Sequence, residues 1–207
     1  MHRSRVWKTY IRRWIPKTLQ IVRIRRSNRA FGEIELQLIE HLSISDRVSI
    51  DVGSNIGSYT FEMIRYCSQV LAFEPVEEHA AHLRSFRLPG VQIFEVALSD
   101  RRGKAQMTIN VTGEASVGGM GSLETIGQHR EGAKTVARIV KTETLDGLVT
   151  KPVGLIKIDV EGHEEAVIKG AENTIRQYSP NLLIELEERL NPGCTGRLRS
   201  KLDGLGY

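Results

Sequence analysis

The stretch Val48-Ser49-Ile50-Asp51-Val52-Gly53-Ser54-Asn55-Ile56-Gly57 places a hydrophobic run directly before a corner with two glycines. We predict that residues 47–51 form a buried strand and that a helix begins near residue 56. Glycines at such a corner let the backbone turn tightly and let a ligand lie against it, while the helix N-terminus offers free N–H groups. The stretch therefore predicts a strand–turn–helix unit that binds a ligand.

The glycine spacing limits which classes of ligand this corner is expected to bind. Gly53 and Gly57 follow the pattern G-x-x-x-G. A dinucleotide fingerprint needs G-x-G-x-x-G, and a P-loop needs a lysine that this corner lacks. Glu74 follows a second predicted strand at 70–73, where a carboxylate can accept hydrogen bonds from two ribose hydroxyls. Either feature alone could be a structural turn or a helix cap, but together they predict a nucleoside-bearing cofactor other than NAD or ATP.

From residue 33 onward, runs of strand length alternate with segments of helical periodicity, which is typical of an α/β fold with a mainly parallel sheet. We expect one domain at 33–207 with a Rossmann-like, doubly wound sheet and helices on both faces. The remaining predicted strands are 91–96, 155–158 and 182–184, with added β structure at 103–111; helices are predicted near 34–42, 56–66, 76–83 and 167–178. The glycine-rich segment 112–132 is predicted to be a mobile loop that closes over the substrate.

Five segments occur in an order that resembles the FkbM family of methyltransferases: Asp51 to Gly57, Phe73-Glu74-Pro75, Ala97-Leu98-Ser99-Asp100, Thr144-Leu145-Asp146 and Ile156-Lys157-Ile158-Asp159-Val160-Glu161-Gly162-His163-Glu164. The resemblance covers about 33–207, and the last segment is its most specific part. It implies a class I fold, S-adenosyl-L-methionine as cofactor and, usually, O-methylation of a hydroxyl on a sugar or another small metabolite.

The resemblance also implies which residues hold the cofactor. The methionine end would be lined by Asp51, Gly53, Ser54, Asn55 and Gly57. Glu74 would bind the ribose, and the end of the third predicted strand would border the adenine through Ala97, Leu98 and Ser99. Plain core packing is the alternative interpretation of Ala97 and Leu98.

Three polar residues, Asp159, Glu161 and His163, follow the fourth predicted strand on the side of the sheet where open α/β folds bind ligands. A histidine can exchange a proton near neutral pH, so His163 is the candidate general base, and Asp159 or Glu161 could orient it or the acceptor. Each residue also has a non-catalytic interpretation. Glu161 could cap a helix, His163 could lie at the surface, and Asp159 could form a hydrogen bond with the glycine corner. Because D-x-E-x-H is not a diagnostic ligand spacing, no metal site is predicted.

The net charge of +4 is unevenly distributed, because residues 1–32 hold ten of the 29 basic residues and no acid. Apolar residues recur between these cations at roughly helical spacing, although Pro16 interrupts them. We expect this basic arm to pack on the acidic body. The alternatives are peripheral contact of residues 1–26 with an anionic membrane and, less favoured, binding to nucleic acid.

Other classes are less well supported. Two widely spaced cysteines, the lack of an apolar run of about 18 residues and the lack of a signal peptide favour a cytoplasmic protein. A nicotinamide oxidoreductase and a non-catalytic protein that docks through the arm stay open as alternatives. Family members usually continue past the equivalent of Tyr207, so residues 182–184 are expected to form an exposed sheet edge.

Overall fold

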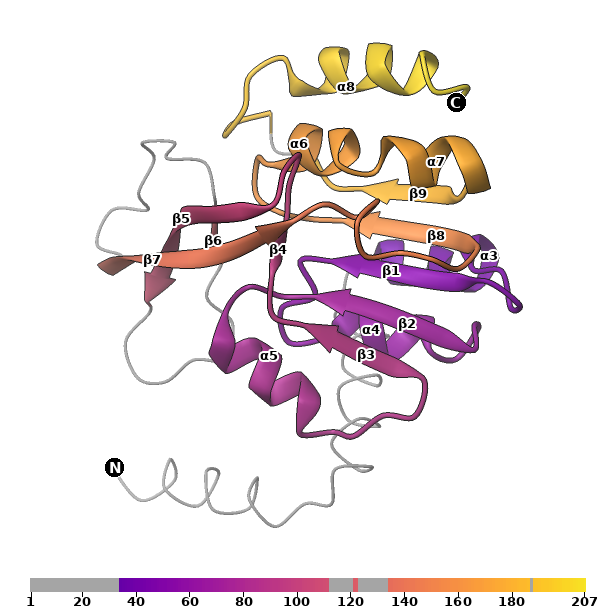
Figure 1. Ribbon diagram of the computed structural model, residues 1–207, viewed down its shortest axis with the longest axis horizontal. Coiled ribbons are helices and arrows are strands. Elements are labelled where there is room, and N and C mark those ends of the chain that lie inside the picture. Colours follow the sequence, from indigo (N-terminus) through magenta and orange to yellow (C-terminus); the bar gives the residue numbers. More distant parts are fainter. Residues whose placement is uncertain (1–33, 112–120, 123–133, 187) are drawn as a thin grey trace.

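The computed structural model describes residues 34–111, 121–122, 134–186 and 188–207. Its main sheet has five strands in the order β3-β2-β1-β8-β9, and every neighbouring pair is parallel. These strands are β1 (Val48–Val52), β2 (Gln69–Phe73), β3 (Val91–Phe94), β8 (Val153–Ile158) and β9 (Asn181–Ile184). Their carboxyl ends point to one side of the molecule (Figure 1), as in the predicted doubly wound α/β fold, which is confirmed.

Helices cover both faces of this sheet, because alternate side chains of each strand point to opposite faces. One face packs against η1 (Ile34–Leu38), α3 (Ile39–Leu42) and α4 (Ser58–Met63), with α5 (Glu77–Arg84) packed against α4. The other face packs against α6 (Glu164–Lys169) and α7 (Glu172–Tyr178). The last helix, α8 (Cys194–Asp203), lies beside the edge of the sheet that β9 forms (Figure 1).

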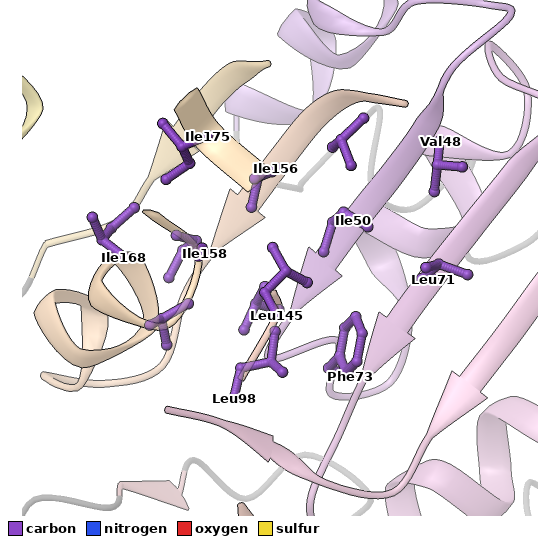
Figure 2. Close-up of a cluster of buried hydrophobic side chains, with 14 of the residues drawn as sticks. Val48, Ile50, Leu71, Phe73, Leu98, Leu145, Ile156, Ile158, Ile168 and Ile175 are labelled. Atoms are coloured by element: carbon purple, nitrogen blue, oxygen red, sulfur yellow. The ribbon is translucent and has the colours of Figure 1, made fainter. Parts of the chain in front are cut away.

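The largest core cluster lies between the sheet and α6 and α7 (Figure 2). Ile50 of β1, Phe73 of β2 and Ile156 of β8 are at most 1% exposed there, and Ile168 and Ile175 from the helices are fully buried against them. All five residues of β1 are buried, as expected for a central strand covered on both faces. This packing fixes the carboxyl ends of β1, β2 and β8 beside one another.

A second sheet, in the order β4-β7-β5-β6, stands at the carboxyl ends of the parallel strands (Figure 1). It consists of β4 (Ala97–Leu98), β5 (Gly103–Val111), β6 (Gly121–Ser122) and β7 (Lys134–Glu143). The prediction of β structure at 103–111 is confirmed. The strand β7, to which β5 is paired in antiparallel fashion, was not predicted, because exposed Val136 and Ile139 disturb the alternation that marks a half-buried strand.

Three sequence-based boundaries were wrong. Ala97 and Leu98 do not end the third strand, since β3 stops at Phe94 and β4 pairs with β7 instead of with the main sheet. The helix predicted across 167–178 is two helices, separated where Gly170 packs so tightly that a Cβ atom would lie 2.0 Å from the carbonyl oxygen of Ser99. Helix α4 is shorter than the predicted 56–66.

Other expectations meet the limits of the described residues. The basic arm at 1–32 and most of the loop at 112–132 lie outside them, so both stay predictions. Among the described strands, β9 forms one edge of the main sheet. In the same part of the chain, no helix combines the length and the apolar character that crossing a membrane requires.

Candidate active site

The glycine corner after β1 is tight because of how the protein packs around it. Gly53, Asn55 and Gly57 all have left-handed backbones, with φ of 74°, 47° and 94°. A Cβ atom on Gly53 would lie 1.9 Å from the carbonyl oxygen of Asp159, and one on Gly57 would lie 2.3 Å from Leu83 Cδ2. Both glycines are therefore required where strand β8 and helix α5 approach the corner.

A cavity opens beyond this corner, at the carboxyl ends of β1, β2 and β8. The second sheet forms part of its wall. Its lining residues are Val52, Gly53, Asn55, Phe73, Glu74, Pro75, Val76, His79, Val96, Ala97, Leu98, Met107, Asp159, Val160 and Glu161. The structure thus brings together five of the predicted cofactor residues, namely Gly53, Asn55, Glu74, Ala97 and Leu98, and two of the predicted catalytic residues, Asp159 and Glu161.

The other predicted site residues do not line the cavity. Asp51 and Ser54 are buried beside it, and Gly57 is the N-cap of α4. Ser99 and His163 contact each other, with 3.0 Å between Ser99 Oγ and His163 Nε2. The predicted site residues therefore divide into those that line the cavity and those that lie behind it, a division that the sequence patterns did not indicate.

Glu74 is held firmly at the cavity and is 4% exposed. Its Oε2 accepts a hydrogen bond of 2.7 Å from the Asn55 backbone, and its Oε1 accepts one of 2.8 Å from the Val76 backbone. The ring nitrogen Nδ1 of His79 lies 3.7 Å from Oε1. Because a carboxylate has about four acceptor positions, Glu74 retains capacity to accept further hydrogen bonds from hydroxyl groups.

Two features of the cavity wall point to a ligand. The side-chain oxygen Oδ1 of Asn55 is buried and, among the described residues, has no hydrogen-bond partner. Such an atom costs free energy unless a ligand or water donates to it. Of the four non-glycine residues with positive φ in the described ranges, two line this cavity, Asn55 and Glu161. Left-handed non-glycine backbones cluster at binding sites, where the surrounding structure holds them.

A buried network of charged side chains lies behind the glycine corner, next to the cavity. Lys157 on β8 is 3% exposed, and its Nζ lies 3.3 Å from Asp159 Oδ2, 3.5 Å from Asp51 Oδ1 and 3.2 Å from the Gly53 carbonyl oxygen. Asp51 also accepts a hydrogen bond of 2.5 Å from Thr60 Oγ1. Lys157 thereby ties β1, β8 and the glycine corner together.

The charges of this network support one another. Burial raises the pKa of Asp51, and Lys157 and Thr60 counteract that rise. Burial also acts to lower the pKa of Lys157, but the carboxylates of Asp51 and Asp159 outweigh it and leave that pKa raised. Lys157 is therefore a cation across the physiological range. Sequence reasoning did not single it out, because its hydrophobic neighbours Ile156 and Ile158 make the segment read as core.

Glu164, at the start of α6, is a second residue that sequence reasoning did not single out. It is 1% exposed, and its Oε1 accepts a hydrogen bond of 2.8 Å from the Gly162 backbone. Burial raises its pKa, and its Oε2 has no hydrogen-bond partner within the described ranges. Glu164 thus fixes the turn that places Glu161 at the cavity. No group of three or more histidine, cysteine or acidic side chains in the described part of the chain is arranged to hold a metal ion.

A doubly wound sheet with a cavity at the carboxyl ends of its central strands is a Rossmann-like arrangement, and open α/β folds of this kind bind their ligands at that position. Residues 51–207 match the family described as the Methyltransferase FkbM domain. The chain belongs to this family, as its sequence motifs predicted.

Two curated relatives are similar over most of this chain. Hexuronic acid methyltransferase AglP from Haloferax volcanii is 30% identical over 175 residues, which are 80% of this chain and 66% of that protein. The 2-O-methyltransferase NoeI from Sinorhizobium fredii is 31% identical over 157 residues, 69% of this chain and 65% of that protein. The chain thus spans just under two thirds of the length of each relative.

A solved structure shows the same fold. The crystal structure of methyltransferase FkbM from Methylobacillus flagellatus matches with a TM-score of 0.54 and 11% identity, over 92% of this chain and 49% of that one. At this identity the match supports the fold alone. It agrees with the five-stranded parallel sheet described above.

Proposed function

We propose that this protein is an S-adenosyl-L-methionine-dependent methyltransferase that methylates a hydroxyl group of a sugar. The observation that carries the proposal is the cavity at the carboxyl ends of β1, β2 and β8, in a chain of the FkbM family. Both curated relatives carry methyltransferase names, and one is named for a hexuronic acid and the other for a 2-O position. Sugar hydroxyls are therefore the acceptor class that we propose.

The residues of the cavity fit the proposed cofactor. Its wall from β4 and β5 is apolar, through Ala97, Leu98 and Met107, and suits an uncharged adenine ring. Glu74 has acceptor capacity for the ribose hydroxyls, and the unpaired Oδ1 of Asn55 suits a donor such as the amino group of the methionine end.

When bound, the cofactor supplies a methyl group on a sulfonium sulfur. The protein must then hold the acceptor hydroxyl in place and take its proton, and alignment of the reacting atoms supplies much of the catalysis. Asp159 and Glu161 line the cavity, so we assign them to contact that hydroxyl and its proton. The role of His163 as general base stays a prediction with less support, because its ring contacts Ser99 and does not line the cavity.

The test is a methylation assay with labelled S-adenosyl-L-methionine against a panel of hydroxylated glycans, together with calorimetry of S-adenosylhomocysteine. Glu74→Ala should weaken binding of S-adenosylhomocysteine by about 1–3 kcal/mol, because charged hydrogen bonds are lost. Glu78→Gln is the matched control, since Glu78 lies on α5 outside the cavity and should leave the affinity unchanged. A wild-type chain that does not bind S-adenosylhomocysteine would overturn the proposal.

A further inference from the structure

Lys157 is a buried cation to which the proposed function gives no role. It is 3% exposed, and it does not line the cavity that we assign to the cofactor, which we call the first cavity. It lines a second cavity instead, together with Tyr59, whose ring centre lies 4.7 Å from the Lys157 ammonium. Lys157 can therefore influence a ligand in the first cavity only through other residues.

The hydrogen bonds of Lys157 go to two residues that line the first cavity. Its Nζ donates to the Gly53 carbonyl oxygen at 3.2 Å and to Asp159 Oδ2 at 3.3 Å. Asp51 Oδ1 lies farther from Nζ, at 3.5 Å, and its residue is fully buried behind the cavity. Asp51 thus serves as the charge partner of Lys157, while the hydrogen bonds of Lys157 are directed at the wall of the first cavity.

Gly53 and Asp159 differ in how much they depend on these bonds. Gly53 is also fixed by its left-handed backbone, by a hydrogen bond of 3.0 Å from its amide to the Phe73 carbonyl oxygen, and by close packing. The carboxylate of Asp159 is 31% exposed by side chain, and within the described ranges Lys157 is the one residue that donates a hydrogen bond to it. Removing Lys157 should therefore release the Asp159 carboxylate and leave the glycine corner in place.

We propose that Lys157 is a positioning residue for methyl transfer, which holds Oδ2 of Asp159 so that Oδ1 faces the first cavity and accepts a hydrogen bond from the acceptor hydroxyl. The hydroxyl oxygen bonds to the methyl carbon as the carbon–sulfur bond breaks with both electrons remaining on sulfur. The hydroxyl proton passes to Asp159 and from there to water. A carboxylate with one oxygen anchored presents the other in a fixed direction, and such alignment supplies much of the rate. This inference rests on the proposed function.

A double-mutant cycle on the full chain tests whether Lys157 acts through Asp159. The assay measures kcat with S-adenosyl-L-methionine and, from a panel of methyl hexosides and methyl hexuronides, the sugar that wild type methylates fastest. Lys157→Met and Asp159→Asn should each lower kcat by about 100-fold, as expected when a reacting group is misplaced by about 1 Å. The double variant should lose about the same 100-fold, whereas independent roles, including a merely structural role of Lys157, would multiply to about 10⁴-fold.

Two further measurements separate positioning from general damage. In Lys157→Met the affinity for S-adenosylhomocysteine, measured by calorimetry, should stay close to that of wild type, because Gly53 and Glu74 keep their own hydrogen bonds. Lys169→Met is the matched control and should keep the wild-type kcat. The side chain of Lys169 is 62% exposed, pairs with Asp100 and lines neither cavity.

If Lys157→Met does not fold, the same cycle is measured in an Asp51→Asn background, where the stranded buried carboxylate is neutral. The inference is overturned if removal of Lys157 leaves kcat unchanged, if the two losses multiply, or if the affinity for S-adenosylhomocysteine falls as much as kcat does. A wild-type chain that binds no S-adenosylhomocysteine, or that methylates no sugar of the panel, is a different result, which overturns the proposed function itself.

Discussion

The two faces of the main sheet differ sharply in what they bury. The face toward α6 and α7 is covered by aliphatic and aromatic side chains, including Ile50, Phe73 and Ile158. On the same strands, the face toward α4 buries Ser49, Asp51 and Lys157. One face therefore resembles an ordinary core, and the other combines a smaller apolar cluster with buried charges.

Buried ion pairs are weak evidence for stability, because removing two charges from water costs about as much as their attraction returns. The pair of Asp51 and Lys157 lies near the carboxyl ends of β1 and β8, beside the glycine corner that lines the cavity. We call the face toward α6 and α7 the apolar face and the face toward α4 the polar face. The comparison indicates that the apolar face chiefly stabilises the fold, whereas the charged residues of the polar face organise the site.

The largest effect is expected where this polar network is broken. Lys157→Met keeps the volume but leaves Asp51 and Asp159 without their cation, so the free energy of unfolding should fall by about 3–5 kcal/mol. Urea denaturation measures it. Adding Asp51→Asn should restore part of the loss, because the stranded charge is then removed. An unchanged midpoint in the single variant would contradict the importance of the network.

A smaller effect, with a pH signature, is expected at Glu164. Because burial raises its pKa above 4.5, its contribution to stability is present below pH 4.5 and is lost as the pH rises through the folded-state pKa. Compared with Glu164→Gln, the wild type should therefore become more stable on going from pH 7 to pH 4.5, because protonation removes the buried charge. Urea titrations of both proteins at the two pH values measure this, and a constant difference would refute it.

The apolar face offers the matched contrast. Ile156→Val removes one methylene from a fully buried position beside Lys157 in sequence, so unfolding should become easier by about 0.5–1.5 kcal/mol. Binding of S-adenosylhomocysteine should not change, because Ile156 lines neither cavity. Calorimetry on this variant tests whether the two faces act independently. A weakened affinity for S-adenosylhomocysteine would show that they do not.

The sequence allowed the fold and the glycine corner to be predicted because both depend on local patterns. The strand before Asp51, the left-handed Gly53 and Gly57, and Glu74 after β2 are all readable from neighbours in the chain. The residues that were missed depend on contacts across the fold. The role of Lys157 is revealed only by its register with Asp51 on the neighbouring strand. Ala97 and Leu98 belong to the second sheet instead of the main sheet because they pair with β7, a strand that was not predicted.

The smallest effect on the free energy of unfolding is expected for a solvent-exposed ion pair, in contrast to the buried charge network. Glu78 on α5 accepts two hydrogen bonds, of 2.5 and 2.7 Å, from Arg138 on β7, and the side chains are 58% and 42% exposed. These bonds lower the pKa of Glu78 from 4.5 to about 2. Solvent screens the pair, so Glu78→Gln should cost only about 0.2–1 kcal/mol at pH 7.

The lowered pKa fixes the direction of the pH dependence of this pair. Its stabilisation is present above pH 4.5, the unfolded-state value, and is lost as the pH falls toward 2, the folded-state value. The difference between wild type and Glu78→Gln should therefore shrink from pH 5 to pH 3, and also shrink in 1 M salt, where the Debye length is about 3 Å. Urea titrations over this range decide the matter. A difference that grows on acidification, or that resists salt, would mean that Glu78 behaves like the buried carboxylates of the polar face, and the contrast between exposed and buried charge in this protein would fail.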